Sequence, residues 1–127
     1  HRVGSGEVEE KILKLNEVKE VCVVAVDDKL EGSRLGVFFS RTKNMKNQKI
    51  KDKINLNLMN YFGSYILPKY LIELSNLPKT KSGKILRRIL RILLNNPKTK
   101  NTGDISTILD KNIIKEIKIK IKETLDE

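Results

Sequence analysis

The chain contains 127 residues, carries a formal net charge of +10 and has a single cysteine. This length suits one domain with a modest hydrophobic core, or one domain followed by a tail. No apolar run approaches the length of a membrane-spanning helix and no secretory signal is present, so we expect no membrane partner. Cys22 lies within an apolar run, which excludes a disulfide framework and favours a reducing compartment, the cytoplasm or the nucleus.

The first residue is His1 rather than methionine, and we therefore expect the chain to be a piece of a longer protein. The excess of positive charge permits attraction to phosphate groups, whether of nucleotides, of coenzyme A or of nucleic acid. Charge alone does not choose among these partners.

The first half of the chain predicts a helix, two strands and a second helix. Residues 6–15 carry apolar side chains at helical spacing, and residues 21–26 form an unbroken apolar run typical of a strand buried on both faces. Residues 35–40 predict a second strand, antiparallel to the first across a short connection. Residues 50–62 place apolar side chains at every fourth position, and Gly63 then predicts the end of that helix.

The second half predicts a third strand over residues 70–74, a loop over residues 78–83 and a helix from Leu86. Residues 95–103 are polar and predict a linker. A final helix is expected from about residue 111, although its IKIKIK run also fits the alternation of a strand.

This order of elements predicts a small α+β domain with a mostly antiparallel sheet and helices packed on it. We place that domain in residues 1–94 and a C-terminal tail in residues 95–127. No internal repeat is visible in the sequence.

Residues 77–91 read LPKTKSGKILRRILR and contain six basic residues with no acidic neighbour. Within this stretch Lys84 follows Ser82 and Gly83 and stands at the start of the basic helix. A glycine at this place permits backbone angles that other residues resist, so the loop can present Lys84 away from the body of the domain.

Three functions compete for this stretch. A phosphate-binding loop needs G-x-x-x-x-G-K-[ST], but Pro78 stands where the first glycine belongs and Ile85 replaces the hydroxyl residue, so we exclude it. Nucleic-acid binding fits the charge, yet no aromatic residue lies in residues 75–127 to stack on bases. A standalone basic module for nucleic acid or an acidic protein stays open as an alternative, as does a solvated charged surface without function.

The third function is a mobile catalytic lysine. An ammonium group on a long stem is a compact point charge with three donors. It suits the bridging of two anions, such as a carboxylate and an α-phosphate, while they react.

The stretch closely resembles the lysine motif near the C-terminus of acyl-adenylate-forming enzymes, the superfamily of acyl-CoA synthetases, peptide-synthetase adenylation domains and firefly luciferase. The opening HRVGSGEVEEKIL is similar to the segment that begins the small C-terminal domain of that family. VKEVCVVAVDD and LPKYLIELSNLPKT match the landmarks that follow, in the same order and spacing.

The tail narrows the resemblance. GDISTILD, residues 103–110, is similar to the tail of AMP-forming acetyl-CoA synthetases and their propionyl relatives. The resemblance implies that residues 1–94 are the mobile lid domain of such an enzyme and that residues 95–127 are its tail extension. It does not separate acetate from propionate, because acyl selectivity would lie in another domain.

The family reaction has two halves, and the resemblance implies both for the whole enzyme. A carboxylate attacks the α-phosphate of ATP to give acyl-AMP and pyrophosphate, and the thiol of CoA then attacks acyl-AMP. ATP, CoA and Mg²⁺ are the implied cofactors, with Mg²⁺ held mainly by an N-terminal adenylation domain of the same chain. The isolated domain is expected to be inactive, and nucleic acid is not an expected partner.

The resemblance also implies roles for single residues. Lys84 would be the catalytic lysine of adenylation, and Ser82 and Gly83 would belong to its binding loop. Arg2 would contact the nucleotide phosphate, and the opening segment with Gly4 would line the CoA tunnel in a second pose of the domain. A lysine acetyltransferase and a deacetylase are implied partners at Lys84, and no metal ligand is expected in this chain.

Overall fold

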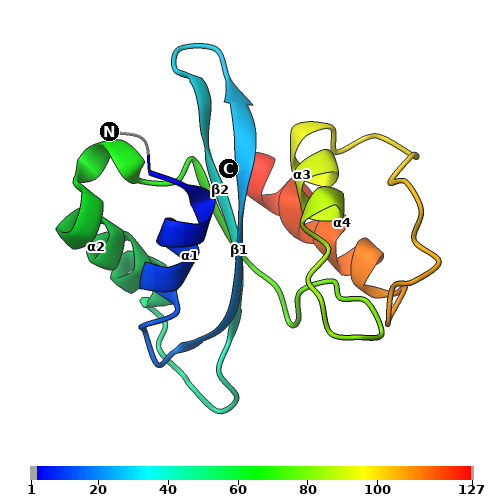
Figure 1. The fold of residues 1–127 in the computed structure, drawn as a ribbon, viewed down its shortest axis with the longest axis horizontal. Coiled ribbons are helices and arrows are strands. Elements are labelled where there is room, and N and C mark those ends of the chain that lie inside the picture. Colours follow the sequence, from blue (N-terminus) through cyan, green and yellow to red (C-terminus); the bar gives the residue numbers. More distant parts are fainter. Residues whose placement is uncertain (1–2, 127) are drawn as a thin grey trace.

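The computed structural model describes residues 3–126, so Arg2, one of the residues singled out above, lies outside the described part of the chain. A three-stranded sheet lies between two pairs of helices (Figure 1). The elements in chain order are α1 (Ser5–Ile12), β1 (Val18–Asp28), β2 (Gly32–Arg41), α2 (Ile50–Phe62), a short 3-10 turn η1 (Ser64–Ile66), β3 (Tyr70–Glu73), α3 (Arg87–Asn95) and α4 (Ile113–Leu125).

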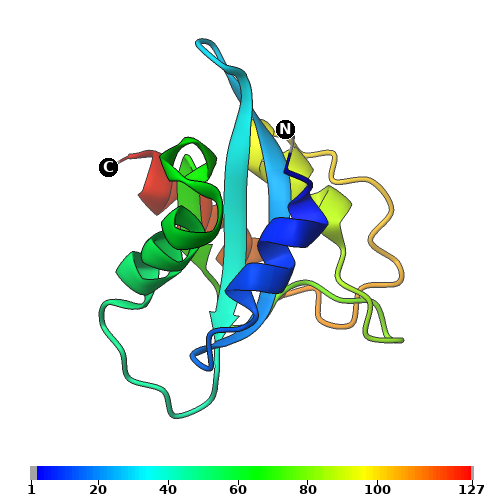
Figure 2. The same cartoon turned by 60° about the vertical axis from the view of Figure 1, so that its left-hand side comes forward.

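The sheet has the strand order β1-β2-β3, with β2 in the centre. β1 and β2 form an antiparallel hairpin, as predicted, and their turn projects beyond the helices in both views (Figures 1 and 2). β3 pairs parallel to β2, from Gly36 opposite Tyr70 to Phe39 opposite Glu73. The connection between these strands contains α2, and a long crossover of this kind returns the chain to run parallel. The predicted α+β class is confirmed, with a sheet that is mixed.

Most of the predicted elements are present with shifted ends. α1 ends at Ile12 rather than residue 15, and both long strands extend beyond their apolar runs. α2 has the predicted bounds, and Gly63 ends it with a φ of 89°, which a residue with a side chain seldom adopts. The IKIKIK run is helical, because its buried isoleucines recur at every fourth position, and the strand alternative is wrong.

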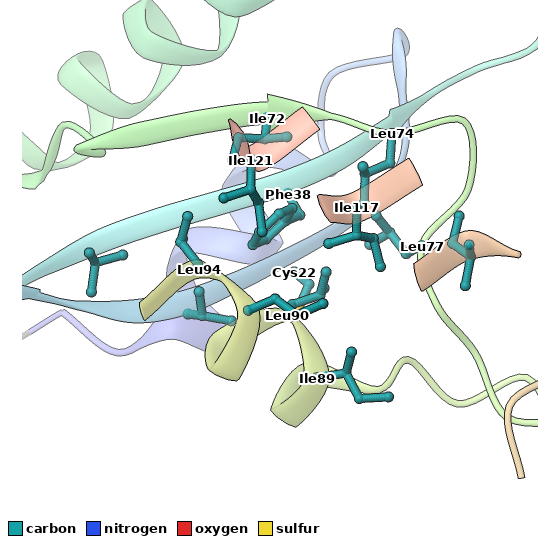
Figure 3. Packing of buried hydrophobic residues seen from close by; sticks show 14 of the residues in the cluster. Cys22, Phe38, Ile72, Leu74, Leu77, Ile89, Leu90, Leu94, Ile117 and Ile121 are labelled. Atoms are coloured by element: carbon teal, nitrogen blue, oxygen red, sulfur yellow. The ribbon is translucent and has the colours of Figure 1, made fainter. Parts of the chain in front are cut away.

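Both faces of the sheet are buried, and each face has its own hydrophobic core. Consecutive residues of β1 alternate between the two, so Val21 and Val23 face α1 and α2 while Cys22 and Val24 face α3 and α4. On the second face Cys22 and Phe38 lie under side chains of α3 and α4 (Figure 3). This arrangement confirms the strand buried on both faces that the unbroken apolar run predicted.

Residues after 94 help to build the second core. Ile108, Ile113, Ile117 and Ile121 are all buried and belong to the same cluster as Leu90 of α3. Physically the tail is therefore a packed layer of the domain. No helix in residues 3–126 is long and apolar enough to cross a membrane.

Side chains form hydrogen bonds with backbone N–H and carbonyl groups on the outer edge of β1. Glu9 of α1 accepts a hydrogen bond from the backbone N–H of Val23 at 2.8 Å, and Arg87 of α3 donates to the carbonyl of the same residue. Asn95 of α3 accepts from the Asp27 N–H and donates to the Ala25 carbonyl, each at 2.9 Å. A covered edge cannot template pairing with another chain, and the same contacts orient α3 along β1.

α3 packs closely against the sheet at Gly36 of β2. A Cβ at this position would overlap Leu94 Cδ2 and lie 2.8 Å from Val26 Cγ2, and both of those side chains are buried. We expect Gly36→Ala to lower the free energy of unfolding by about 1–3 kcal/mol, because a packed core absorbs an added methyl group only by shifting its neighbours. Urea denaturation of the 127-residue chain measures this change.

The matched control is Gly6→Ala in α1, where no heavy atom lies within 4 Å of the new Cβ. There alanine removes the entropic penalty of a helical glycine, so the chain should gain up to about 1 kcal/mol. Equal effects of the two substitutions would contradict the close approach of α3 to β2.

Candidate functional site

The predicted lysine loop is a tight hairpin. The carbonyl of Pro78 accepts a hydrogen bond from the N–H of Leu86 at 2.8 Å, and the Thr80 N–H donates to the Lys84 carbonyl at 2.9 Å. The Gly83 N–H closes the turn by donating to the Thr80 carbonyl, also at 2.9 Å. The backbone on either side of Lys84 in the sequence is therefore held by hydrogen bonds.

Ser82 and Gly83 form the tip of this hairpin. Gly83 has a φ of 94°, and its missing side chain would meet no heavy atom within 4 Å, so the need for glycine is conformational rather than steric. The Thr80 hydroxyl lies 2.9 Å from the Ser82 hydroxyl and accepts a hydrogen bond from the Lys84 N–H at 3.1 Å. These contacts fix the backbone at the base of the Lys84 side chain.

The Lys84 side chain is exposed. Within residues 3–126 its ammonium group makes no hydrogen bond and no ion pair, in contrast to Lys79 on the opposite strand of the hairpin. A free ammonium group on a defined backbone can approach an anion brought by another domain or a ligand.

Lys79 anchors the base of the hairpin to the sheet. Its ammonium group forms an ion pair with Glu20 of β1 and donates to the carbonyl of Leu77 at 3.2 Å. Glu20 also accepts from the Ser40 hydroxyl at 2.7 Å and from the Leu77 N–H at 3.3 Å. Ser40 is the one buried polar residue among those described, and Glu20 accepts the hydrogen bond of its hydroxyl group.

The arginines that follow the hairpin are held as well. Arg87 makes a two-pronged ion pair with Glu9 of α1, at 2.7 and 3.2 Å, and this contact raises the pKa of the guanidinium. The guanidinium of Arg88 lies against Gly103, where any side chain would collide with it. Lys79 and Arg87 are thus ion-paired while Lys84 is free, which speaks against a single phosphate-binding face.

Gly4, the other described residue predicted to bind a ligand, is exposed and caps α1. Its carbonyl accepts from the N–H groups of Glu7 at 3.1 Å and Val8 at 3.3 Å. In Figure 1 the start of α1 and the lysine hairpin lie on opposite sides of β1, although Glu9 of α1 forms an ion pair with Arg87 just after the hairpin. The structure therefore brings Ser82, Gly83 and Lys84 together and leaves Gly4 at a second location.

Residues 7–84, more than half of the chain, match the family model described as the AMP-binding enzyme C-terminal domain. The chain belongs to this family.

Two curated relatives of this AMP-binding C-terminal domain are acetyl-coenzyme A synthetases. Acetyl-coenzyme A synthetase from Emericella nidulans is 34% identical over 118 residues, which cover 92% of this chain and 18% of the relative. Acetyl-coenzyme A synthetase 1 from Debaryomyces hansenii is 32% identical over 126 residues, which cover 98% of this chain and 19% of the relative. The chain therefore spans about a fifth of the length of the curated relatives it matches.

Solved structures share the fold of the AMP-binding C-terminal domain. An acyl-CoA synthetase from Brucella canis superposes with a TM-score of 0.64 at 28% identity, over 72% of this chain and 17% of the other. Acetoacetyl-CoA synthetase from Streptomyces lividans superposes with a TM-score of 0.75 at 18% identity, over 96% of this chain and 18% of the other. The second likeness covers α4 and the tail, and at that identity it shows the fold alone.

Sequence reasoning missed Glu20 as a residue of this site. It lies in β1 and is separated by 59 positions from Lys79, so no local pattern connects the two. The available signal was an acidic residue inside a run of strand-forming residues, where charge needs a partner. Residues 3–126 contain no group of three or more His, Cys, Asp or Glu side chains that could hold a metal ion.

The network around Glu20 predicts a pH-dependent contribution to stability. Burial raises the pKa of Glu20, but hydrogen bonds from Lys79, Ser40 and the Leu77 N–H outweigh it, so the pKa lies below its ordinary value of 4.5. The stability that this carboxylate contributes is present above pH 4.5 and is lost as the pH falls through the lowered pKa. Glu20→Gln should cost about 1–3 kcal/mol at about pH 7 and much less at about pH 3.

Urea denaturation at the two pH values measures this difference. Glu10→Gln is the matched control, because the Glu10 side chain is 72% exposed and its nearest lysine nitrogen lies 4.0 Å away. That control should change stability by less than about 0.5 kcal/mol at either pH. A Glu20→Gln effect of the same size at both pH values would show that the carboxylate charge is not the cause.

Proposed function

We propose that this chain is the C-terminal domain of an AMP-forming acetyl-CoA synthetase. The whole enzyme would convert acetate, ATP and CoA into acetyl-CoA, AMP and pyrophosphate through acetyl-AMP. Residues 1–94 would be its mobile lid domain and residues 95–127 its tail extension. The observation that carries the proposal is the free ammonium group of Lys84, presented by a hydrogen-bonded hairpin in a domain of this family.

Three further observations support the same assignment. The relatives named acetyl-coenzyme A synthetase match over 92–98% of the chain, including the tail beyond the family model. Lys79 and Arg87 are engaged by Glu20 and Glu9, which leaves Lys84 as a free donor on the hairpin. The Lys84 side chain is exposed on this domain, which fits half of a site completed by another domain.

The chemistry assigned to Lys84 is electrostatic. When a carboxylate attacks the α-phosphate of ATP, negative charge spreads over the oxygens of both groups and pyrophosphate leaves. The Lys84 ammonium group would donate to a carboxylate oxygen and an α-phosphate oxygen at once and so reduce their repulsion as the bond forms. The hairpin would place that donor before the reaction, so little reorganisation is needed at the transition state.

The second half-reaction would use a different surface of the domain. We place the start of α1, with Gly4 and with Arg2, beside the CoA thiol and the nucleotide phosphate in a second orientation of the lid. The start of α1 and the hairpin lie on opposite sides of β1 (Figure 1), which supports this proposal, because surfaces that face different ways can be presented in turn by a rotating domain. Rotation between the two orientations would then commit the enzyme to adenylation or to thioester formation.

The remaining parts of the site would come from other groups. Mg²⁺ neutralises phosphate charge in reactions of this type, and the described residues of this chain offer it no cluster of ligands. We assign it to ATP and to an N-terminal adenylation domain of the same chain, which would also bind acetate. The isolated domain would therefore be inactive.

We also propose that Lys84 is a site of reversible acetylation by a lysine acetyltransferase and a deacetylase. Its side chain is exposed at the tip of a hairpin, where a second enzyme can reach it. Acetylation removes the positive charge and two of the three donors, so adenylation would stop while the fold is kept.

The experiment uses the longer protein and separates its two half-reactions. Lys84→Ala should lower acetate-dependent ATP–pyrophosphate exchange by at least about 10²–10³-fold, because a preorganised donor to the transition state is lost. Thioester formation from supplied acetyl-AMP and CoA should stay within about threefold of the wild type, since Lys84 takes no part in it.

Lys100→Ala is the matched control, because Lys100 is also exposed but lies in the segment after α3. It removes the same charge and should leave both half-reactions unchanged. An equal loss of both half-reactions in Lys84→Ala would defeat the role assigned to this lysine.

A further inference from the structure

We propose that residues 105–109 of the tail are a positioning element for Lys84. This inference rests on the proposed function for its catalytic consequence, whereas its structural part stands on the contacts alone. The segment runs antiparallel beside the first strand of the lysine hairpin, and Thr80 and Ile108 form the bridge between them. The two segments lie side by side in both views (Figures 1 and 2).

Two backbone hydrogen bonds join the segment to the hairpin. The N–H of Leu109 donates to the carbonyl of Lys79 at 2.8 Å, and the N–H of Lys81 donates to the carbonyl of Thr107 at 3.3 Å. On its other side the same hairpin strand pairs with the strand that carries Lys84 and Ile85. Residues 105–109 thus act as a third strand on a hairpin that would otherwise have two.

The segment itself is fixed to the body of the domain. Ile108 is 3% exposed and belongs to the core formed by α3, α4 and the sheet, and Ile105 packs against that core. Just before it, Gly103 lies against the Arg88 guanidinium of α3. The Asp104 carboxylate accepts a hydrogen bond from the Ser106 N–H at 2.9 Å, which closes a turn into the segment. Because the segment is packed in the core and hydrogen-bonded to the hairpin, it holds the hairpin in a fixed position relative to the core.

The hairpin needs this support because its tip is exposed. Lys81, Ser82, Gly83 and Lys84 are all exposed and contribute nothing to the hydrophobic core. Isolated two-stranded hairpins are at best marginally stable in water, and exposed loops open locally at little cost. A donor that is displaced by about 1 Å from its reacting partner loses much of its effect on the rate.

Leu109→Pro tests the inference at the level of the backbone. Proline removes the N–H that bonds to Lys79, while the Leu109 side chain is 61% exposed and adds little to the core. Leu109→Ala is the matched control, because it shortens the same side chain and keeps the N–H. Amide hydrogen exchange of the 127-residue chain, followed by NMR, reports the opening of the hairpin at Gly83 and Lys84.

We expect exchange at Gly83 and Lys84 to accelerate about fivefold in Leu109→Pro, as the loss of one net hydrogen bond implies, and to stay unchanged in Leu109→Ala. Exchange of β2 amides such as that of Val37 should not change in either variant. Unchanged exchange at the hairpin in Leu109→Pro would overturn the inference, whatever the activity of the enzyme.

Should Leu109→Pro fail to fold, Ile108→Ala takes its place and Ile121→Ala becomes the control. Both isoleucines are buried in the same core, but only Ile108 lies on the segment that pairs with the hairpin. The two variants should destabilise the chain similarly, and only Ile108→Ala should accelerate exchange at Gly83 and Lys84 beyond the global change. Equal acceleration in both variants would show that the segment acts only as a part of the core, and would overturn its positioning role.

The catalytic part is tested in the longer protein. Leu109→Pro should lower ATP–pyrophosphate exchange about fivefold and leave thioester formation from acetyl-AMP within about twofold, a split that general destabilisation would not produce. Faster hairpin exchange with unchanged adenylation would overturn the positioning role and leave the Lys84→Ala result intact. Lys84→Ala without effect would defeat the proposed function, while the exchange data would still decide whether the segment orders the hairpin.

Discussion

The rest of the structure depends on one constraint, the burial of the β1–β2 pair on both faces. Val23 and Cys22 are neighbours in the chain yet belong to different cores, so each face of the pair must be covered by its own helices. With a chain of 127 residues this requires two thin helical layers rather than one thick core. Gly36 shows how closely the second layer approaches, because α3 packs where β2 has no side chain.

The same constraint determines where the lysine hairpin lies. α3 is held along the outer edge of β1 by Arg87 at its first turn and by Asn95 at its last, so the loop that precedes α3 must emerge beside β1. There Glu20 binds Lys79 and fixes the base of the hairpin. Charge neutralisation at the base and an unpaired ammonium group at the tip are therefore two consequences of one packing arrangement. The local dielectric at the base also favours the ion pair, since both side chains are mostly buried.

The local sequence pattern was sufficient to predict most of the helices and strands. It did not reveal contacts between residues that are distant in the chain. The unbroken apolar run of β1 and the apolar residues at every fourth position of α2 each predicted one element. In both cases the pattern reflects which faces of the element are buried. The direction of β3 leaves no mark on its own four residues, because parallel and antiparallel ladders differ in the geometry of their backbone hydrogen bonds. Lys84 was identified by motif and resemblance, whereas Glu20 and residues 105–109 become part of its surroundings only when the chain is folded.

The match to the family model ends at Lys84, but the physical domain does not. Without α3 and α4 the second face of the sheet would leave Cys22, Phe38 and Ile72 open to water, and exposed apolar surface on that scale opposes folding. The residues that follow Lys84 must therefore fold with those that precede it. A segment that has to pack on this face in any case passes beside the hairpin on its way to α4, and two backbone hydrogen bonds are enough to couple the two. The position of the lysine is in this way tied to the same core that stabilises the domain.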